Sequence, residues 1–181
     1  MSVDQWSFTS PFEGVIPHLY LDTRGNVTCG VGFLVRTRSD VARFEWRPDT
    51  ATAESDFDAV SKAAKGYVAS HYEAMCRASL TESTMRAHFD THVMSVRLDS
   101  GMAMWTLDAL PDAAQLALVD MAFNLGVAGL AKFKKLHAAV MARDWLTAAA
   151  ESSRRGVQAS RNTATAEAFR SCAQSSGGTN A

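Results

Sequence analysis

The sequence has few cysteines, no long apolar run and almost no net charge, and each absence excludes a class of protein. The three cysteines (Cys29, Cys76 and Cys172) are far apart and form no CxxC pair, so neither a zinc site nor a disulfide framework is indicated. We therefore expect free thiols, as in a protein made in a reducing compartment. No run of about 18 apolar residues exists, so we expect no stable insertion in a membrane.

The charged residues are unevenly distributed along the chain. The formal net charge of −1 argues against nucleic acid as a partner. Ten Lys/Arg and sixteen Asp/Glu lie up to Leu130, whereas eight Lys/Arg and three Asp/Glu lie from Ala131 onward. This basic C-terminal part suits a polyanionic substrate such as a cell-wall polymer, and it suits a solvated helix surface without a partner equally well.

The length and composition are those of one globular domain with a sizeable core. The chain has 181 residues, of which 47% are hydrophobic and 20% are charged. Its first residues, Met-Ser-Val-Asp-Gln-Trp, lack the basic start and apolar core of a signal peptide. We therefore expect synthesis in the cytoplasm without a leader.

Two carboxylates, a hydroxyl and four glycines lie close together between Glu13 and Gly32. Apolar residues before Asp22 predict a strand, residues 23–26 predict a turn, and residues 27–29 predict the returning strand. Glu13 and Asp22 would then face each other across a short ribbon, as a two-carboxylate acid–base pair requires. From composition alone, a turn-forming aspartate and a solvated glutamate fit the same pattern.

The spacing in this stretch is specific. Asp22 follows Glu13 by nine positions, and Thr28 follows Asp22 by six. The accompanying positions hold Gly14, Tyr20, Gly25, Gly30 and Gly32. This composite resembles the signature of the phage-type (T4-like) lysozymes, a family of muramidases, in which Glu-Gly, an aromatic residue, Asp, Gly, Thr and Gly-x-Gly occur in this order.

Two later segments agree with the resemblance. Residues 117–126 look like the family's central helix, which ends in Phe-Asn-apolar-Gly and here contains Asn124; alone, they fit a core helix with a glycine stop. Arg161 matches an arginine at the start of a late helix that pairs with the catalytic glutamate. The resemblance thus implies that Arg161 holds Glu13 and tunes its ionisation, whereas alone Arg161 fits a surface position at a helix start.

The resemblance implies a mainly α (α+β) fold with two lobes. It covers residues 8 to 172, within a single domain at 1–172 that is followed by a flexible polar tail at 173–181. The small lobe carries the ribbon at about 13–50, the helical lobe lies at about 76–172, and a long helix joins them. A cleft between the lobes would take a glycan strand.

Apolar periodicity and capping residues predict the helices. The candidate for the joining helix has apolar positions from Phe57 to Met75 and a cap at Asp49 or Thr50, with Gly66 as a weak point in its middle. Further helices are expected after a capping box at 79–82, over 112–123 behind Pro111, after Asp144, and from 160–163 onward.

Two residues near the motif depart from the family pattern. Pro11 lacks an amide hydrogen and disfavours helix at Ser10, so we expect a short or displaced helix before Glu13. Phe33 stands where many bacterial relatives have histidine, which we interpret as a difference in support rather than in chemistry.

A pair of histidines raises the question of a metal site. His88 and His92 lie four apart on a predicted helix, which is a metal-binding spacing. No glutamate follows His88 and no third ligand is evident, so we expect two partly exposed histidines and no metal.

The resemblance implies hydrolysis of the β-1,4 bond between N-acetylmuramic acid and N-acetylglucosamine in peptidoglycan, with inversion at the anomeric carbon and without a cofactor. Glu13 would be the general acid, Asp22 the ionised partner of a water molecule, and Thr28 the residue that positions this water. Tyr20 and Gly32, with Asn124 and Arg161, would bind substrate or support the site.

Two alternatives remain open at this point. A lytic transglycosylase on the same fold would use Glu13 alone, and a non-catalytic wall-binding module would retain only the fold. A monomer that acts on the cell wall from the periplasmic side fits two settings: a bacteriolytic endolysin released through a holin, or an antibacterial effector delivered by a secretion system and neutralised by an immunity protein.

Overall fold

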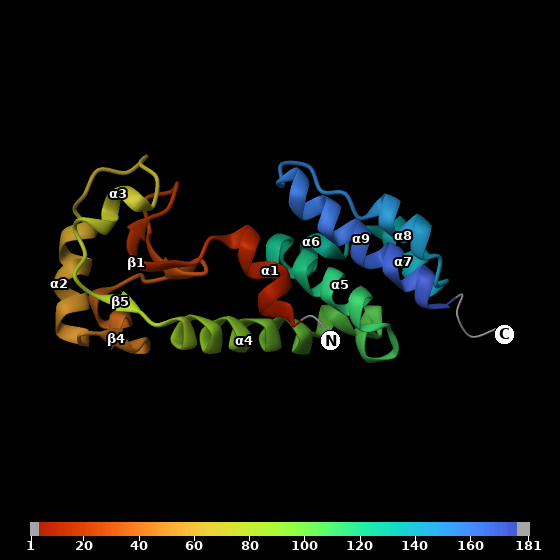
Figure 1. Cartoon of the computed structure of the whole chain (residues 1–181), viewed down its shortest axis with the longest axis horizontal. Coiled ribbons are helices and arrows are strands. Elements are labelled where there is room, and N and C mark those ends of the chain that lie inside the picture. Colours follow the sequence, from red (N-terminus) through yellow and green to blue (C-terminus); the bar gives the residue numbers. More distant parts are fainter. Residues whose placement is uncertain (1–3, 177–181) are drawn as a thin grey trace. The chain divides into compact units, whose positions relative to one another are not determined.

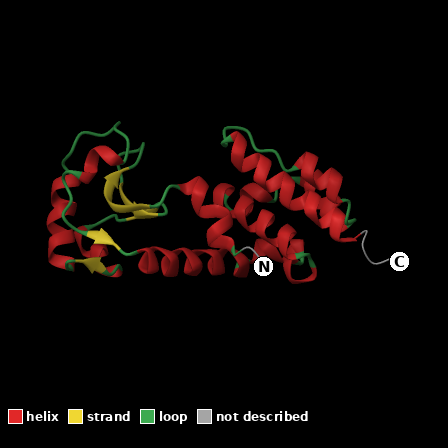
Figure 2. Ribbon diagram, viewed as in Figure 1, coloured by secondary structure: helices red, strands yellow, loops and turns green. Residues whose placement is uncertain are grey.

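The computed structural model describes residues 4–176, which are mainly α-helical with two small antiparallel sheets. The helices, labelled in Figure 1 and coloured red in Figure 2, are α1 (Gln5–Glu13), α2 (Thr50–Val60), α3 (Ser70–Glu73), α4 (Glu82–Leu98), α5 (Asp112–Leu125), α6 (Val127–Leu130), α7 (Lys134–Met141), α8 (Trp145–Glu151) and α9 (Ala159–Ser176). The strands are β1 (Ile16–Leu21), β2 (Val27–Gly30), β3 (Phe33–Leu34), β4 (Trp46–Arg47) and β5 (Ser79–Leu80), and short 3-10 helices lie at Arg38–Arg43, Ser100–Trp105 and Leu107–Ala109. The predicted mainly α, α+β class is confirmed.

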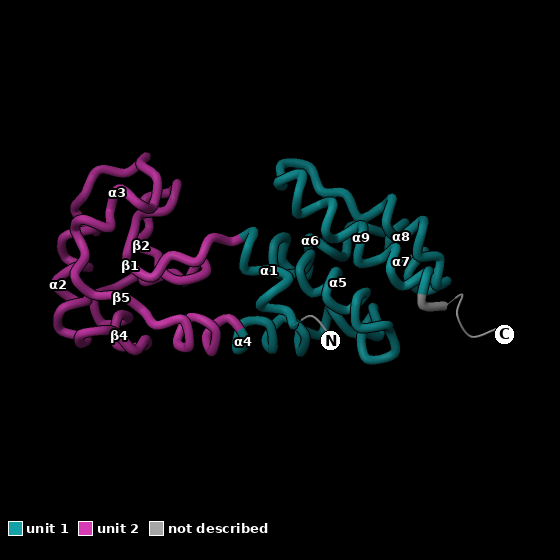
Figure 3. The backbone as a smooth tube through the Cα atoms, viewed as in Figure 1, with its two compact units in different colours: residues 1–12, 90–181 teal, residues 13–89 magenta. Residues whose placement is uncertain are grey.

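The chain divides into two compact units, which Figure 3 colours separately. One unit contains the chain up to Phe12 and again from Asp90 onward; the other runs from Glu13 to Phe89. The unit that carries the ribbon thus begins at Glu13, as expected for the small lobe, but extends well beyond residue 50. The N-terminal helix belongs to the helical unit up to Phe12.

The unit at 13–89 is built on a three-stranded meander. Strands β1, β2 and β3 pair in this order, and the register of β1 with β2 places Tyr20 opposite Thr28 and Leu21 opposite Val27. A bulge interrupts the pairing between Ile16 and Tyr20. The core of this unit is formed by Leu19, Leu21, Val27, Cys29, Val35, Val41, Phe57, Val60, Tyr72 and Leu80, all of which are buried.

The joining helix predicted from a cap at Asp49 or Thr50 to Met75 is correct in its first part and wrong in its continuity. The cap is confirmed, since the Asp49 carboxylate accepts from the Thr52 amide at 2.7 Å. Helix α2 ends at Val60, Gly66 adopts a φ of +98°, and only Ser70–Glu73 is helical again as α3. The Tyr72 hydroxyl donates to the Ala64 carbonyl oxygen at 2.8 Å. In a continuous helix, this carbonyl would accept a hydrogen bond from a backbone amide of the same helix. The apolar periodicity extends across the loop between α2 and α3 because both helices bury side chains in the same core, and the sequence therefore resembled that of one long helix.

The long helix that leads from one unit into the other along the chain is α4. A helix starting here was predicted, but its cap is Thr81, whose hydroxyl accepts from the Thr84 amide at 3.1 Å. Ser79, the expected capping residue, lies instead in β5, where it pairs with Arg47 of β4. The long-range pairing of β4 with β5 therefore delays the start of the helix by two residues.

The helical unit is organised around α5, which is flanked by α9 and α6. Six apolar side chains of α5 are buried: Ala114, Ala117, Leu118, Val119, Met121 and Ala122. The prediction for this helix is confirmed, with Gly126 as its stop at a φ of +72°, although Leu116 and Phe123 are only half-buried. The predicted cap of α8 is confirmed too, since the Asp144 carboxylate accepts from the Thr147 amide at 3.1 Å.

The structure differs from the sequence predictions at both ends of the described chain. Helix α1 is short, as expected, but it includes Ser10 and Pro11 and ends at Glu13. Pro11 lies in the last turn and removes one amide donor there, and the helix ends two residues later. Helix α9 continues to Ser176, so the predicted tail is helical over residues 173–176, and its remainder lies outside the described residues.

Within residues 4–176, no helix has both the length and the apolar character needed to cross a membrane. All three cysteines are free thiols; Cys29 and Cys172 are buried and Cys76 is half-buried.

Candidate active site

The turn between β1 and β2 holds the carboxylate of Asp22. The turn is closed by two backbone hydrogen bonds, from the Asp22 amide to the Asn26 carbonyl and from the Gly25 amide to the Asp22 carbonyl, each of 2.9 Å. Gly25 has a φ of +88°, which a residue with a side chain rarely adopts. Inside this turn, Asp22 Oδ1 accepts from the amides of Arg24 and Asn26 at 2.8 Å, and Oδ2 accepts from the Asn26 side chain at 3.0 Å.

These donors determine the ionisation of Asp22. Partial burial acts to raise the pKa of the carboxyl, but the hydrogen bonds from Asn26, Arg24 and Gly25 outweigh it and lower the pKa below the ordinary value of 3.8. Asp22 is therefore a carboxylate at neutral pH. It can accept a proton or stabilise a positive charge, and it cannot serve as the proton donor of a reaction.

Tyr20 and Thr28 lie on the same face of the hairpin, because they are directly opposed across β1 and β2. The Thr28 hydroxyl is buried and donates to the carbonyl oxygen of Asn26 at 3.1 Å. The pKa of the Tyr20 phenol is raised by burial and by the charges of Cys29, Asp22 and Glu13, in this order. Tyr20 therefore stays neutral, and its ring lies within electrostatic reach of both carboxylates of the motif.

Glu13 is the last residue of α1 and is half-buried. Gly14 follows with a φ of +72°, a backbone conformation that ends the helix and directs the chain into β1. The structure thus places Glu13 between a helix end and the hairpin that carries Asp22. All four of Glu13, Tyr20, Asp22 and Thr28 belong to the unit at 13–89.

The two glycines after β2 have different structural roles. Gly30 has a φ of +59°, and a Cβ atom there would lie 2.5 Å from Cδ2 of Phe33. Phe33 in turn stacks on Phe44 at a centroid distance of 5.9 Å and packs against His88 at 5.7 Å. Gly32 has a φ of +76°, but a Cβ atom there would meet nothing within 4 Å, so its backbone conformation alone requires glycine.

The predicted histidine pair is used in packing. His88 contacts Phe44 at 4.6 Å between ring centroids, and burial followed by the charge of Arg43 lowers its pKa. His92 packs edge-on against Phe123 at 4.7 Å. In the part of the chain that the structure describes, no group of three or more His, Cys, Asp or Glu side chains could hold a metal ion.

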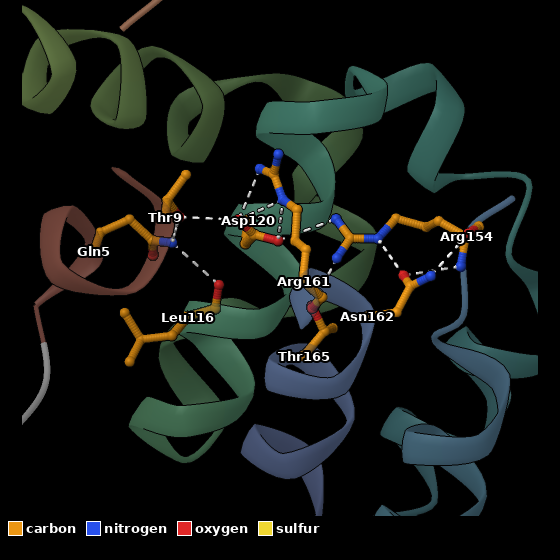
Figure 4. Close-up of polar contacts among 8 residues, drawn as sticks. All are labelled: Gln5, Thr9, Leu116, Asp120, Arg154, Arg161, Asn162 and Thr165. Carbon is orange, nitrogen blue, oxygen red and sulfur yellow. Dashed lines mark hydrogen bonds and ion pairs between the residues drawn. The ribbon is translucent and has the colours of Figure 1, made fainter. Parts of the chain in front are cut away.

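Arg161 lies in a buried polar cluster of the helical unit (Figure 4). Its Nε and Nη2 atoms donate to the carboxylate of Asp120, the shortest distance being 2.8 Å. The Arg154 Nη1 atom donates to the same carboxylate at 3.0 Å, and so does the Thr9 hydroxyl. Arg161 is thus a buried residue rather than a surface arginine, and its pairing with Glu13 stays a prediction.

Sequence reasoning missed the centre of this cluster. Asp120 is fully buried, whereas residues 117–126 were predicted only as a core helix with a glycine stop. A single carboxylate in such an apolar run was the signal available, because a buried charge requires a charged or hydrogen-bonding partner. Asn124, on the same helix, is exposed near its C-terminal end.

A groove lies beside Asp22, within the unit at 13–89. It has a volume of about 450 Å³ and is lined on one side by residues 20–23 of the hairpin and on the other by residues 66–69. The carboxylate held by the turn is therefore accessible from a concave surface.

Comparison of the chain with protein-family models finds no matching family, and comparison with curated proteins finds no matching relative. The function of the site is therefore inferred from its residues and their geometry.

Proposed function

We propose that the protein is a peptidoglycan hydrolase with a phage-type lysozyme fold, which cleaves the β-1,4 bond between N-acetylmuramic acid and N-acetylglucosamine. The observation that carries this proposal is the clamped carboxylate of Asp22, on a hairpin that also carries Tyr20 and Thr28 and is entered directly from Glu13. The spacing of these residues supports it, as does the chain order of a hairpin unit, a long helix and a helical unit.

The two carboxyl groups have different tasks in this reaction. Asp22 is ionised and cannot donate a proton, so Glu13 is the general acid that protonates the leaving glycosidic oxygen. Asp22 stabilises the positive charge that develops on the sugar ring and accepts a proton from the attacking water. Inversion requires the two carboxyl groups to be roughly 6.5–9.5 Å apart.

Thr28 positions the attacking water through its lone pairs. Its only proton is donated to the Asn26 carbonyl, so the hydroxyl oxygen can only accept from a water molecule. A water that donates to both Thr28 and Asp22 has its own lone pair left to attack the anomeric carbon. Gly32, Asn124 and Arg161 complete this proposal as supporting or substrate-binding residues.

The substrate suggests two biological settings for the same chemistry. As an endolysin, the protein would reach the wall through holin pores; as an antibacterial effector, it would be delivered by a secretion system and paired with an immunity protein. In both settings we propose a monomer that binds peptidoglycan glycan strands and needs no cofactor.

The reaction type is tested by digesting purified peptidoglycan with the protein and identifying the products. Hydrolysis yields a new reducing N-acetylmuramic acid end with the mass of one added water, which mass spectrometry detects. Products with 1,6-anhydro-muramic ends instead indicate a lytic transglycosylase. Sedimentation with the wall polymer without any new end indicates a binding module. Either of the last two results overturns the proposal.

A further inference from the structure

The groove beside Asp22 has a second wall, which the proposed reaction does not use. Residues 66–69, between α2 and α3, line this groove together with residues 20–23. Two residues of this wall are strongly exposed although they are apolar: Tyr67 has 54% of its surface exposed and Val68 has 74%. Apolar side chains exposed at the rim of a groove are typical of ligand-binding surfaces.

The ring of Tyr67 is stacked on a neighbouring ring. It stacks on the imidazole of His71 with a centroid distance of 4.0 Å and an interplanar angle of 16°. His71 packs edge-on against the fully buried Tyr72. The imidazole of His71, an exposed side chain, therefore covers one face of the phenol ring, and the rest of the ring is open to a ligand because more than half of Tyr67 is exposed.

Three contacts attach this segment to the hairpin and to itself. The His18 Nε2 atom lies 3.0 Å from the carbonyl oxygen of Ala69, and the Cys76 thiol donates to the Leu19 carbonyl at 3.3 Å. The Tyr72 hydroxyl closes the loop by its hydrogen bond to Ala64. The wall is thus positioned relative to Asp22 before any ligand binds, which lowers the entropic cost of binding.

We propose that the face of Tyr67 is the stacking platform of a saccharide subsite, which holds an N-acetylhexosamine ring of the same glycan strand that Asp22 acts on. A pyranose ring presents a face of C–H groups that packs on an aromatic ring, while its hydroxyl and acetamide groups project sideways toward polar atoms. Among the residues that line the groove, Thr23 carries a hydroxyl, Asp22 a carboxylate and residues 66–69 their backbone polar groups. The identity of the sugar rests on the proposed function.

A binding experiment tests this subsite without catalysis. The Glu13→Gln protein is titrated with N,N′,N″-triacetylchitotriose, and two-dimensional ¹H–¹⁵N NMR spectra follow the backbone amides. We expect the largest shifts at residues 66–69 and 22–23. Tyr67→Ala in the same background should weaken binding about tenfold, and Tyr67→Phe should retain it, because the ring rather than the hydroxyl makes the contact. Leu146→Ala, which removes an equally exposed apolar side chain in the other unit, should have no effect.

A kinetic experiment separates this inference from the proposed function. In the active protein, Tyr67→Ala should raise KM on peptidoglycan with kcat nearly unchanged, since the platform lies beside the reacting bond. If the wild type releases no reducing ends but the trisaccharide still binds at Tyr67, hydrolysis is wrong and the subsite stands. If the wild type is active but Tyr67→Ala equals it in both trisaccharide affinity and KM, the subsite is wrong and hydrolysis stands. Shifts confined to residues outside the groove also overturn the subsite.

Discussion

Asn26 donates two hydrogen bonds to Asp22, one from its backbone amide to Oδ1 and one from its side-chain amide to Oδ2. With the Arg24 amide, the turn thereby supplies three hydrogen bonds to the carboxylate, of which one comes from a side chain. The ionisation of Asp22 is consequently a local property of the hairpin, which can be altered without disturbing the core.

The first prediction concerns the pH dependence of activity. Asn26→Ala removes one donor that favours the charged form of Asp22, so the pKa of this carboxyl rises and the acidic limb of the pH–rate profile moves to higher pH. Activity near neutral pH should change little. Arg24→Ala is the matched control, because Arg24 contributes only its backbone amide to the turn. Identical acidic limbs for Asn26→Ala and the wild type would contradict this role of Asn26.

The same substitution predicts a pH-dependent loss of stability. Because the pKa of Asp22 is lower in the folded than in the unfolded chain, its stabilising contribution is present above about pH 4 and is lost as the pH falls through the folded pKa. Asn26→Ala should therefore lower the free energy of unfolding at pH 7 by roughly 0.5–1 kcal/mol, and by much less near pH 2. Urea unfolding at the two pH values measures this difference, and an equal loss at both would count against it.

The third prediction compares two glycines of the ribbon. Gly30→Ala combines a strained φ with a Cβ contact of 2.5 Å to Phe33, and should lower the free energy of unfolding by about 2–3 kcal/mol. Gly32→Ala has the strained φ alone and should cost about 1 kcal/mol. The double variant Gly30→Ala/Phe33→Ala relieves the contact, so its two substitutions should cost less than the sum of the single ones. Equal losses for Gly30→Ala and Gly32→Ala would show that Phe33 does not restrict this position.

The fourth prediction concerns the buried cluster of the helical unit. Asp120→Ala removes the carboxylate that Arg154 and Arg161 share in the core, and should destabilise the protein by about 3–5 kcal/mol. The matched control is Asp112→Ala, at the exposed first turn of the same helix, which should cost less than about 1 kcal/mol. Thermal unfolding monitored by circular dichroism compares the two, and similar melting temperatures would refute the importance of the cluster.

The features predictable from the sequence are those set by neighbours in the chain. The turn at 22–26, the cap at Asp144 and the stop at Gly126 depend on side chains and backbone conformations within a few residues. The environment of Asp22 belongs to this class, because its hydrogen-bond donors lie two and four residues further on.

The features that escaped prediction depend on residues far apart in the chain. Strand β5 pairs Leu80 with Trp46, and this contact replaces the first turn of the expected helix. Asp120 pairs with Arg161, which lies 41 residues further along the chain, and no local sequence pattern encodes this pairing. The groove likewise requires the loop at 66–69 to return to the hairpin, whereas the apolar periodicity favoured an uninterrupted helix there.

The most direct test of the central claim is the rate at which the purified protein releases reducing ends from peptidoglycan, with and without the carboxyl group of Glu13. Glu13→Gln keeps the size and polarity of the side chain but cannot donate a proton in the same way, so the rate should fall by at least about 100-fold while the melting temperature stays close to that of the wild type. Glu45→Gln, an exposed acid of the same unit, should retain full activity. A folded Glu13→Gln protein that cleaves as fast as the wild type would contradict the assignment of Glu13 as the general acid.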